Sequence, residues 1–64
     1  MITFGQLMQK KRKSAGLTQE QVAEKMGVKR ATYAQYESDK RTPKTLTLKK
    51  IADALGCPID DLIA

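Results

Sequence analysis

The chain has 64 residues, of which 41% are hydrophobic, and 12 Lys and Arg against 7 Asp and Glu give it a formal net charge of +5 at pH 7. So short a chain builds one compact core, and a single cysteine, Cys57, and no histidine exclude a disulfide framework and argue against a structural metal site. We therefore expect a single domain over residues 1–64, stabilised by side-chain packing, with a polyanion as the natural partner of its charge.

Gly and Pro residues divide the chain into five predicted short helices. The first runs from about Thr3 to Ser14, because Phe4, Leu7 and Met8 recur at helical spacing before Ala15-Gly16 ends the pattern. The basic residues of its last turn complement the negative end of the helix dipole.

Thr18 and Gln21 have the spacing of a capping box, which predicts a second helix from about Gln19 to Met26. Its inner face consists of Val22, Ala23 and Met26. Gly27 allows a sharp turn, and a third helix is expected from about Lys29 to Ser38. Two short helices joined by such a turn predict a helix-turn-helix.

Residues 39–43 indicate a basic loop that ends at Pro43. A fourth helix is expected to begin near Lys44 to Leu46 and to end at Gly56, with Leu48, Ile51, Ala52 and Leu55 as its apolar positions. Pro58 is predicted to be the first residue of a final helix, with Asp60 and Asp61 in its first turn and Ile59, Leu62 and Ile63 as its apolar residues.

The chain resembles the lambda-repressor-like, or Cro/C1 and XRE-type, helix-turn-helix domains of phage and bacterial regulators. The resemblance rests on the segment LTQEQVAEKMGV at 17–28, followed by Tyr33, Tyr36, Glu37, Pro43 and Leu48-x-x-Ile51-Ala52-x-x-Leu55. It implies an all-α, compact bundle of five short helices. It also implies sequence-specific binding of double-stranded DNA by a transcriptional regulator, more often a repressor than an activator, with the helix from Lys29 to Ser38 in the major groove.

The resemblance implies that base edges are contacted by the start of that helix and by one residue a turn further along: Lys29, Arg30, Ala31, Thr32 and Gln35. Their chemistry agrees with this role. Arg30 can donate two hydrogen bonds to guanine, Gln35 can pair with adenine, and Ala31 or the Thr32 methyl group can meet a thymine methyl group. Of these five residues, we expect Arg30 and Gln35 to make the main base contacts.

Contacts with the DNA backbone are expected at two places. The first is the start of the second helix, where the resemblance implies that Gln19, with Thr18 beside it, holds a phosphate with the free backbone amides. The second is the loop before the fourth helix, with Lys40, Arg41 and Lys44; Lys11 and Lys13 are weaker candidates. The resemblance further implies a structural ion pair between Arg12 and Glu37.

Three residues depart from the family pattern. Asp39 is expected to place an acidic group close to the DNA backbone and to narrow the interface. Tyr33 stands where a smaller aliphatic residue is usual, so we expect its ring in the core and its hydroxyl near the surface. Cys57 is expected to pack in the interior rather than to react.

A second class of function stays open, because the same fold can serve as a protein-interaction module, such as an antitoxin-like or anti-regulator protein. An enzyme is not expected, and no cofactor, metal site or small-molecule ligand is indicated. We expect at most a weak homodimer that forms mainly on DNA through a surface around Ile59. Apolar runs fall short of the ~20 residues that cross a bilayer, and the first residues lack the layout of a signal peptide, so a cytoplasmic protein without a membrane partner is expected.

Overall fold

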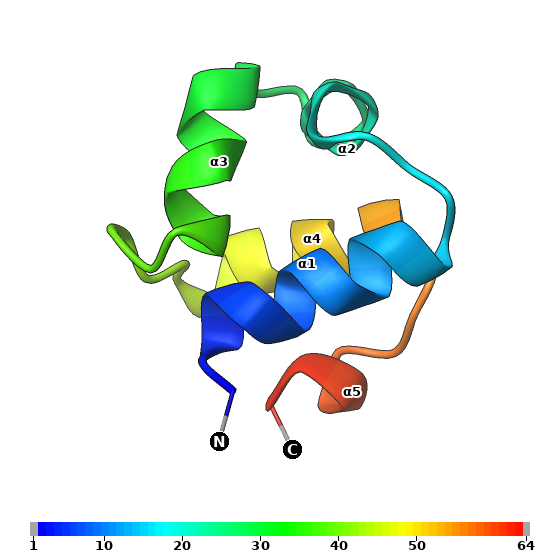
Figure 1. Cartoon of the computed structure of the whole chain (residues 1–64), viewed down its shortest axis with the longest axis vertical. Helices are drawn as coiled ribbons and strands as arrows, with labels where there is room; N and C mark the ends of the chain where they lie inside the picture. Colours follow the sequence, from blue (N-terminus) through cyan, green and yellow to red (C-terminus); the bar gives the residue numbers. More distant parts are fainter. Residues whose placement is uncertain (1, 64) are drawn as a thin grey trace.

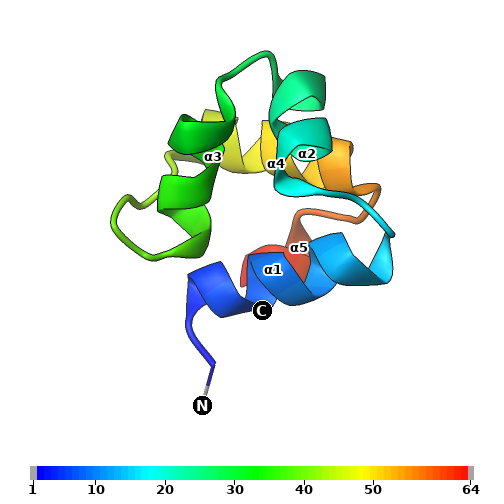
Figure 2. The ribbon, with the colours of Figure 1, turned by 45° about the horizontal axis from the view of Figure 1, so that its top comes forward.

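The computed structural model describes residues 2–63, which form five helices and no strand: α1 (Phe4–Ser14), α2 (Gln19–Met26), α3 (Arg30–Glu37), α4 (Thr45–Leu55) and α5 (Asp60–Ile63). The predicted all-α fold is confirmed. α2 and α3 form one end of the bundle, with α1 and α4 packed beneath them and α5 below α1 (Figure 1). Turning the molecule shows the tight connection that joins α2 to α3 (Figure 2). None of the described helices is long and apolar enough to cross a membrane.

The predicted helix boundaries differ from the observed ones mainly at α5. Pro58 is predicted to be its first residue, but the helix begins at Asp60, so that prediction is wrong. The carbonyl of Pro58 accepts a hydrogen bond from the Asp61 amide at 3.1 Å, and the Ile59 carbonyl accepts one from the Leu62 amide at 2.9 Å. Pro58 and Ile59 therefore precede the helix, because their carbonyls accept the hydrogen bonds of the tight turns at its start.

Both α1 and α2 begin with a capping box. In α2 the Thr18 hydroxyl accepts from the Gln21 amide at 3.1 Å and the Gln21 side chain accepts from the Thr18 amide at 2.8 Å, as predicted. Thr3 and Gln6 form a second capping box at the start of α1, with distances of 3.1 and 2.9 Å. The predicted turn after α2 is confirmed by Gly27, whose φ of 74° few other residues adopt.

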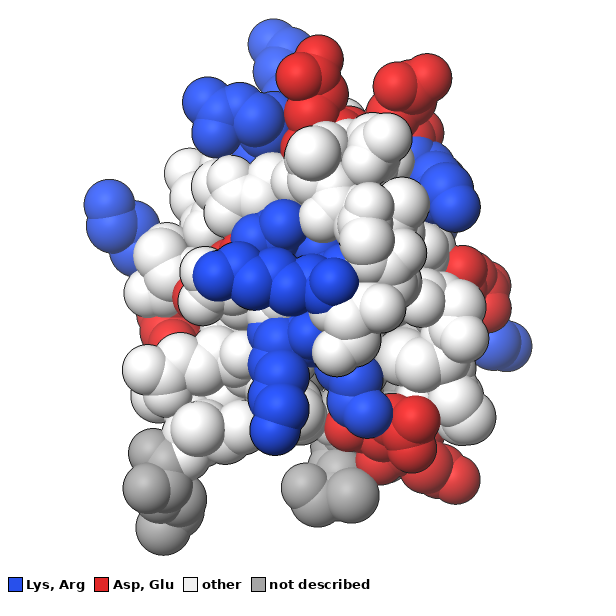
Figure 3. Space-filling model, turned by 45° about the vertical axis from the view of Figure 1, so that its right-hand side comes forward, with Lys and Arg blue, Asp and Glu red and all other residues white. Residues whose placement is uncertain are grey.

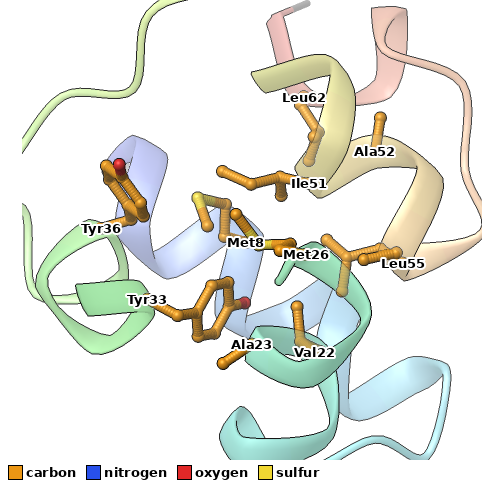
Figure 4. Close-up of a cluster of buried hydrophobic side chains, with 11 residues drawn as sticks. Met8, Val22, Ala23, Met26, Tyr33, Tyr36, Ile51, Ala52, Leu55 and Leu62 are labelled. Atoms are coloured by element: carbon orange, nitrogen blue, oxygen red, sulfur yellow. The ribbon is translucent and has the colours of Figure 1, made fainter. Parts of the chain in front are cut away.

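The hydrophobic core lies where α1, α2, α3 and α4 meet. Its largest fully buried side chains are Tyr33, Met8, Ile51 and Val22 (Figure 4). The prediction that the Tyr33 hydroxyl lies near the surface is wrong: the residue is 0% exposed and the hydroxyl is buried. α3 is covered by both α1 and α2, so the side chains on its inner face are largely shielded from solvent.

Gly5 allows the start of α1 to approach the end of α3. A Cβ atom at Gly5 would lie 2.2 Å from the backbone carbonyl oxygen of Glu37, closer than any real side chain allows. This contact between two backbones fixes the end of α3 against α1. No local sequence pattern predicts this role for Gly5.

The end of α1 is joined to α5. Lys11 Nζ lies 3.8 Å from the Asp61 carboxylate, so this lysine is partly neutralised by its neighbour.

Cys57 is half-buried and packs against the core, in the manner expected of it. Burial, and next the negative charge of Asp61, raise the pKa of the Cys57 thiol, which disfavours the reactive thiolate.

Candidate nucleic-acid interface

α3 has two faces of opposite character. Its inner face carries the buried residues Tyr33, Tyr36 and Glu37. The residues expected to contact bases lie on the other sides of the helix: Lys29, Arg30, Ala31 and Gln35 are exposed, and Thr32 is half-buried. The structure therefore brings the expected base-contacting residues together on one accessible surface, with Thr32 at its margin.

The beginnings of α3 and α4 differ from those of α1 and α2. Their N-cap residues are Lys29 and Lys44, and neither helix start has a side-chain cap hydrogen bond. The first backbone amides of these helices thus keep their hydrogen-bonding capacity for an external acceptor. A lysine beside the positive end of a helix dipole forms a favourable place for a phosphate group.

On the inner face of α3, the Glu37 carboxylate links α3 to α1 and α2. Arg12 of α1 donates to it from Nε at 2.7 Å and from Nη2 at 3.4 Å, and Gln19 of α2 donates from Nε2 at 3.0 Å. A third nitrogen of Arg12 donates to the Leu17 carbonyl at 2.8 Å. The two charged side chains are only 11% and 5% exposed, so this ion pair is buried.

The burial of this ion pair changes the pKa of Glu37 and that of the neighbouring Tyr33. Burial alone would raise the pKa of Glu37, but it is outweighed by the hydrogen bonds that Arg12 and Gln19 donate, by the Arg12 charge and by the polar Tyr33 hydroxyl close by. Together these hold the pKa below its usual 4.5. Burial, and next the Glu37 carboxylate, raise the pKa of Tyr33 far above its ordinary value. Glu37 therefore stays ionised and Tyr33 stays neutral at neutral pH.

Gln19 links this buried pair to the outer surface. Its amide nitrogen donates to Glu37, while its side-chain oxygen lies 3.5 Å from Nη1 of Arg30. The sequence assigns Gln19 to phosphate alone. The observed contacts give it a second role, because they orient the amide and place its oxygen beside the arginine expected to read a base.

A shallow hollow of about 480 Å³ lies along the outer side of α3. Its lining includes Arg30, Ala31 and Gln35, which the sequence singles out, and Gln9, Ala34 and Ser38, which it does not. Helical spacing could have found Ala34, which lies four residues after Arg30 on the same side. Gln9 comes from α1, and only the tertiary fold places it here.

The loop between α3 and α4 carries the second group of expected phosphate contacts: Lys40, Arg41 and Lys44, all exposed. The loop is fixed to the end of α3, because the amides of Lys40 and Arg41 donate to the Gln35 carbonyl at 3.0 and 3.2 Å. Asp39 precedes them. The sequence predicts that its acidic group lies close to the DNA backbone; in the structure its carboxylate points toward the start of α1, where it accepts two hydrogen bonds.

Basic side chains also gather away from α3. The side of the molecule shown in Figure 3 carries Lys and Arg in the middle of the view, with acidic side chains above and at the lower right. The last turn of α1 contains Lys11, Arg12 and Lys13. Only Lys13 of these three is exposed, since Arg12 binds Glu37 and Lys11 lies beside Asp61, so Lys13 is the better placed of the two weaker phosphate candidates.

Comparison with known proteins gives consistent matches. The helix-turn-helix family model HTH_3 matches residues 8–62. The chain is 40% identical over 65 residues to the HTH-type transcriptional regulator RghRB of Bacillus subtilis, covering 100% of this chain and 47% of that protein. It is 37% identical over 62 residues to the immunity repressor of Bacillus phage phi105, covering 97% and 43%. The chain thus spans about half the length of these curated relatives.

Solved structures agree with this result. The restriction-modification controller protein C.AhdI from Aeromonas hydrophila superimposes with a TM-score of 0.88 at 30% identity, covering 92% of this chain and 89% of that one. The clp gene regulator ClgR from C. glutamicum shares the fold, with a TM-score of 0.89 at 22% identity over 94% of this chain and 78% of that one. With the family match over residues 8–62, this shows that the chain belongs to the Cro/C1-type (XRE) helix-turn-helix family of transcriptional regulators.

Proposed function

We propose that the chain binds double-stranded DNA in a sequence-specific manner and acts as the DNA-binding part of a transcriptional regulator, with repression as its expected effect. The observation that carries this proposal is the division of α3, which presents Arg30, Ala31 and Gln35 outward while its inner face is fixed in the core. A helix held in this way can enter the major groove without rearrangement. The names of two relatives, a phage repressor and a restriction-modification controller, support the same function.

The base contacts follow from the side chains on this surface. Arg30 is suited to the O6 and N7 atoms of guanine, and its contact with Gln19 limits the directions in which it can point. Gln35 is suited to adenine, while Ala31 and the Thr32 methyl group are suited to thymine methyl groups. Lys29 stands at the edge of this group, where it can reach either a base or a phosphate.

Phosphate contacts on either side of α3 would set the position of the domain on the duplex. On one side we propose Gln19 and Thr18 at the start of α2. On the other side we propose the exposed basic residues of the loop and of the α4 N-cap, which are Lys40, Arg41 and Lys44. Both groups flank α3, which is the arrangement that a helix lying in a groove between two phosphate backbones requires.

A weak homodimer on DNA fits this function, because two half-sites supply affinity that one small interface rarely gives. Ile59, the residue first expected to mediate it, is partly buried against the core, so only part of its side chain is available. Among the described residues, Leu46 at the start of α4 is a large hydrophobic side chain that is 70% exposed. Sedimentation of the protein with and without its DNA site tests this proposal, and a monomer in both states contradicts it.

The decisive experiment is a selection from random double-stranded DNA with the wild type and Arg30→Ala. The wild type should enrich one sequence, and its affinity should fall with added salt with a log-log slope of about −0.9 for each phosphate contacted. Arg30→Ala should lose preference at one base pair, at a cost of about 1–3 kcal/mol.

Lys25→Ala is the matched control, because it removes the same charge from an exposed residue in the last turn of α2. It should leave the selected sequence unchanged. A wild type that enriches no sequence contradicts the proposal and favours the protein-interaction module that shares this fold.

A further inference from the structure

Asp39 occupies an unusual place in the backbone. With a φ of 62° it is the one non-glycine residue with a positive φ among residues 2–63. Aspartate tolerates this left-handed conformation better than most residues, and it follows the end of α3, where the chain turns back toward α1. The conformation directs the side chain away from the outer surface of α3.

The Asp39 carboxylate closes the start of α1. Its Oδ2 accepts from the Thr3 hydroxyl at 2.6 Å, and its Oδ1 accepts from the Gly5 amide at 2.9 Å. A carboxylate at the positive end of a helix is electrostatically favourable, and both of its oxygens have donors here. Asp39 therefore joins residues that lie 36 and 34 positions away in the sequence.

These hydrogen bonds also help to hold the backbone of the basic loop that follows Asp39. On the α3 side, the amides of Lys40 and Arg41 donate to the Gln35 carbonyl. On the α1 side, the carboxylate of Asp39 provides the anchor. The backbone that carries two of the proposed phosphate contacts is thus held between α1 and the end of α3.

We propose that Asp39 is a positioning residue for DNA binding, which orients Lys40 and Arg41 toward phosphate although it is itself an acid in a basic region. The inference rests on the proposed function. If the Asp39 charge alone mattered, removing it should strengthen binding to a polyanion. If its position matters, removing its hydrogen bonds to α1 should weaken binding, so experiments can distinguish the two effects.

Two substitutions distinguish position from charge. Asp39→Gly keeps the left-handed backbone and removes the carboxylate, so the loop loses its anchor on α1. Asp39→Asn also tolerates this backbone and keeps an oxygen for the Gly5 amide, so it removes the charge and retains most of the anchor. Asp53→Asn is the matched charge control, because Asp53 is exposed on α4 outside the proposed interface.

The first measurement is the affinity for the selected DNA over a range of salt concentrations. Asp39→Gly should bind about tenfold more weakly, with an unchanged base preference and a salt slope that is shallower by about 0.9 for each phosphate that Lys40 or Arg41 no longer neutralises. Asp39→Asn should bind at least as tightly as the wild type. Asp53→Asn should match the wild type.

The second measurement needs no DNA. Backbone ¹⁵N order parameters of Lys40 and Arg41 should lie near ~0.85 in the wild type and in Asp39→Asn, and fall toward ~0.6 in Asp39→Gly. Unchanged order parameters in Asp39→Gly overturn the inference, as does wild-type affinity of that variant for DNA that the wild type binds. A wild type that selects no DNA contradicts the proposed function itself, and the inference fails with it.

Discussion

The two faces of α3 are built from different side chains and are held in place to different degrees. On the inner face, Tyr33, Tyr36 and Glu37 are buried and touch neighbouring helices. On the outer face, Arg30 and Gln35 are accessible, and the one hydrogen bond that their own side chains make to other described residues is the long contact of Arg30 with Gln19. Substitutions on the inner face are therefore expected to act through the stability of the fold, whereas a residue of the outer face can change with little cost to the fold.

This difference separates two consequences of mutation. Substitutions on the inner face should change the free energy of unfolding and affect DNA binding only through the amount of folded protein. Substitutions on the outer face should alter affinity or base preference while the domain stays folded. Single substitutions can test whether this separation holds within one helix of eight residues.

The largest effect is expected from Glu37→Ala. It leaves the buried Arg12 guanidinium without its carboxylate and should lower the free energy of unfolding by roughly 3 kcal/mol. Thermal or urea unfolding measures this change. Glu24→Ala, which removes an exposed acid from α2, is the control and should be nearly neutral. An unchanged melting temperature for Glu37→Ala would contradict the structural role of the pair.

The same carboxylate predicts how stability depends on pH. Its pKa in the folded state lies below the usual 4.5, so its contribution is fully present above pH 4.5 and is lost as the pH falls through the lower folded value. Glu37→Gln cannot titrate. Urea unfolding between pH 7 and about pH 3 should therefore show a shallower loss of stability below pH 4.5 for this variant than for the wild type. Parallel curves would show that Glu37 does not carry this dependence.

On the outer face, Gln35→Ala should cost about 1–3 kcal/mol of discrimination at one base pair, where the wild type is expected to prefer adenine. The Gln35 backbone carbonyl still accepts from the loop, so unfolding should change little. A DNA selection and a thermal melt on the same preparation measure both quantities. A lowered melting temperature with unchanged base preference would assign Gln35 to the fold instead.

At Lys29, one substitution should raise stability and weaken DNA binding at the same time. It has the backbone angles of an N-cap but makes no cap hydrogen bond, whereas α1 and α2 both begin with a threonine cap. Lys29→Ser supplies the missing acceptor and should stabilise the domain by about 1 kcal/mol. It should also weaken DNA binding and reduce the salt slope by about 0.9 if Lys29 neutralises a phosphate as proposed.

Lys25→Ser is the control, since it removes the same charge without adding a cap at the start of a helix. A Lys29→Ser variant that is more stable and binds DNA as tightly as the wild type would remove Lys29 from the interface. Such a result would leave the uncapped start of α3 without a functional reason.

The parts of the fold that can be predicted from the sequence are those encoded locally. Thr18 with Gln21 and Gly27 mark the start and end of α2 within a few residues, so spacing alone suffices. The box of Thr3 and Gln6 has the same spacing and could have been found in the same way. The ion pair of Arg12 and Glu37 spans 25 positions, and resemblance to a family predicts it where periodicity cannot.

What could not be predicted depends on contacts between distant segments. The departure of Asp39 from the family pattern predicts an acidic group close to the DNA backbone, but no local pattern predicts its bonds to the start of α1. Gly5 has no local signal, since its role arises only where two helices meet. Gln19 and Arg30 lie 11 positions apart on different helices, so their contact follows from the angle between α2 and α3.

The smallest effect is expected from Tyr33→Phe, on the same inner face as Glu37. The Tyr33 hydroxyl is buried and finds no hydrogen-bond partner among residues 2–63. Removing it deletes a polar group that lost its hydration on folding, so the free energy of unfolding should change by less than about 1 kcal/mol and can increase. Tyr36→Phe is the control, and urea unfolding at neutral pH measures both. A decrease of about 2 kcal/mol or more, within the range of about 1.5–3 kcal/mol for a hydrogen bond to a charged group, would show that the hydroxyl bonds to Glu37. The inner face would then depend on a polar network that includes Tyr33, and not on the packing of its ring alone.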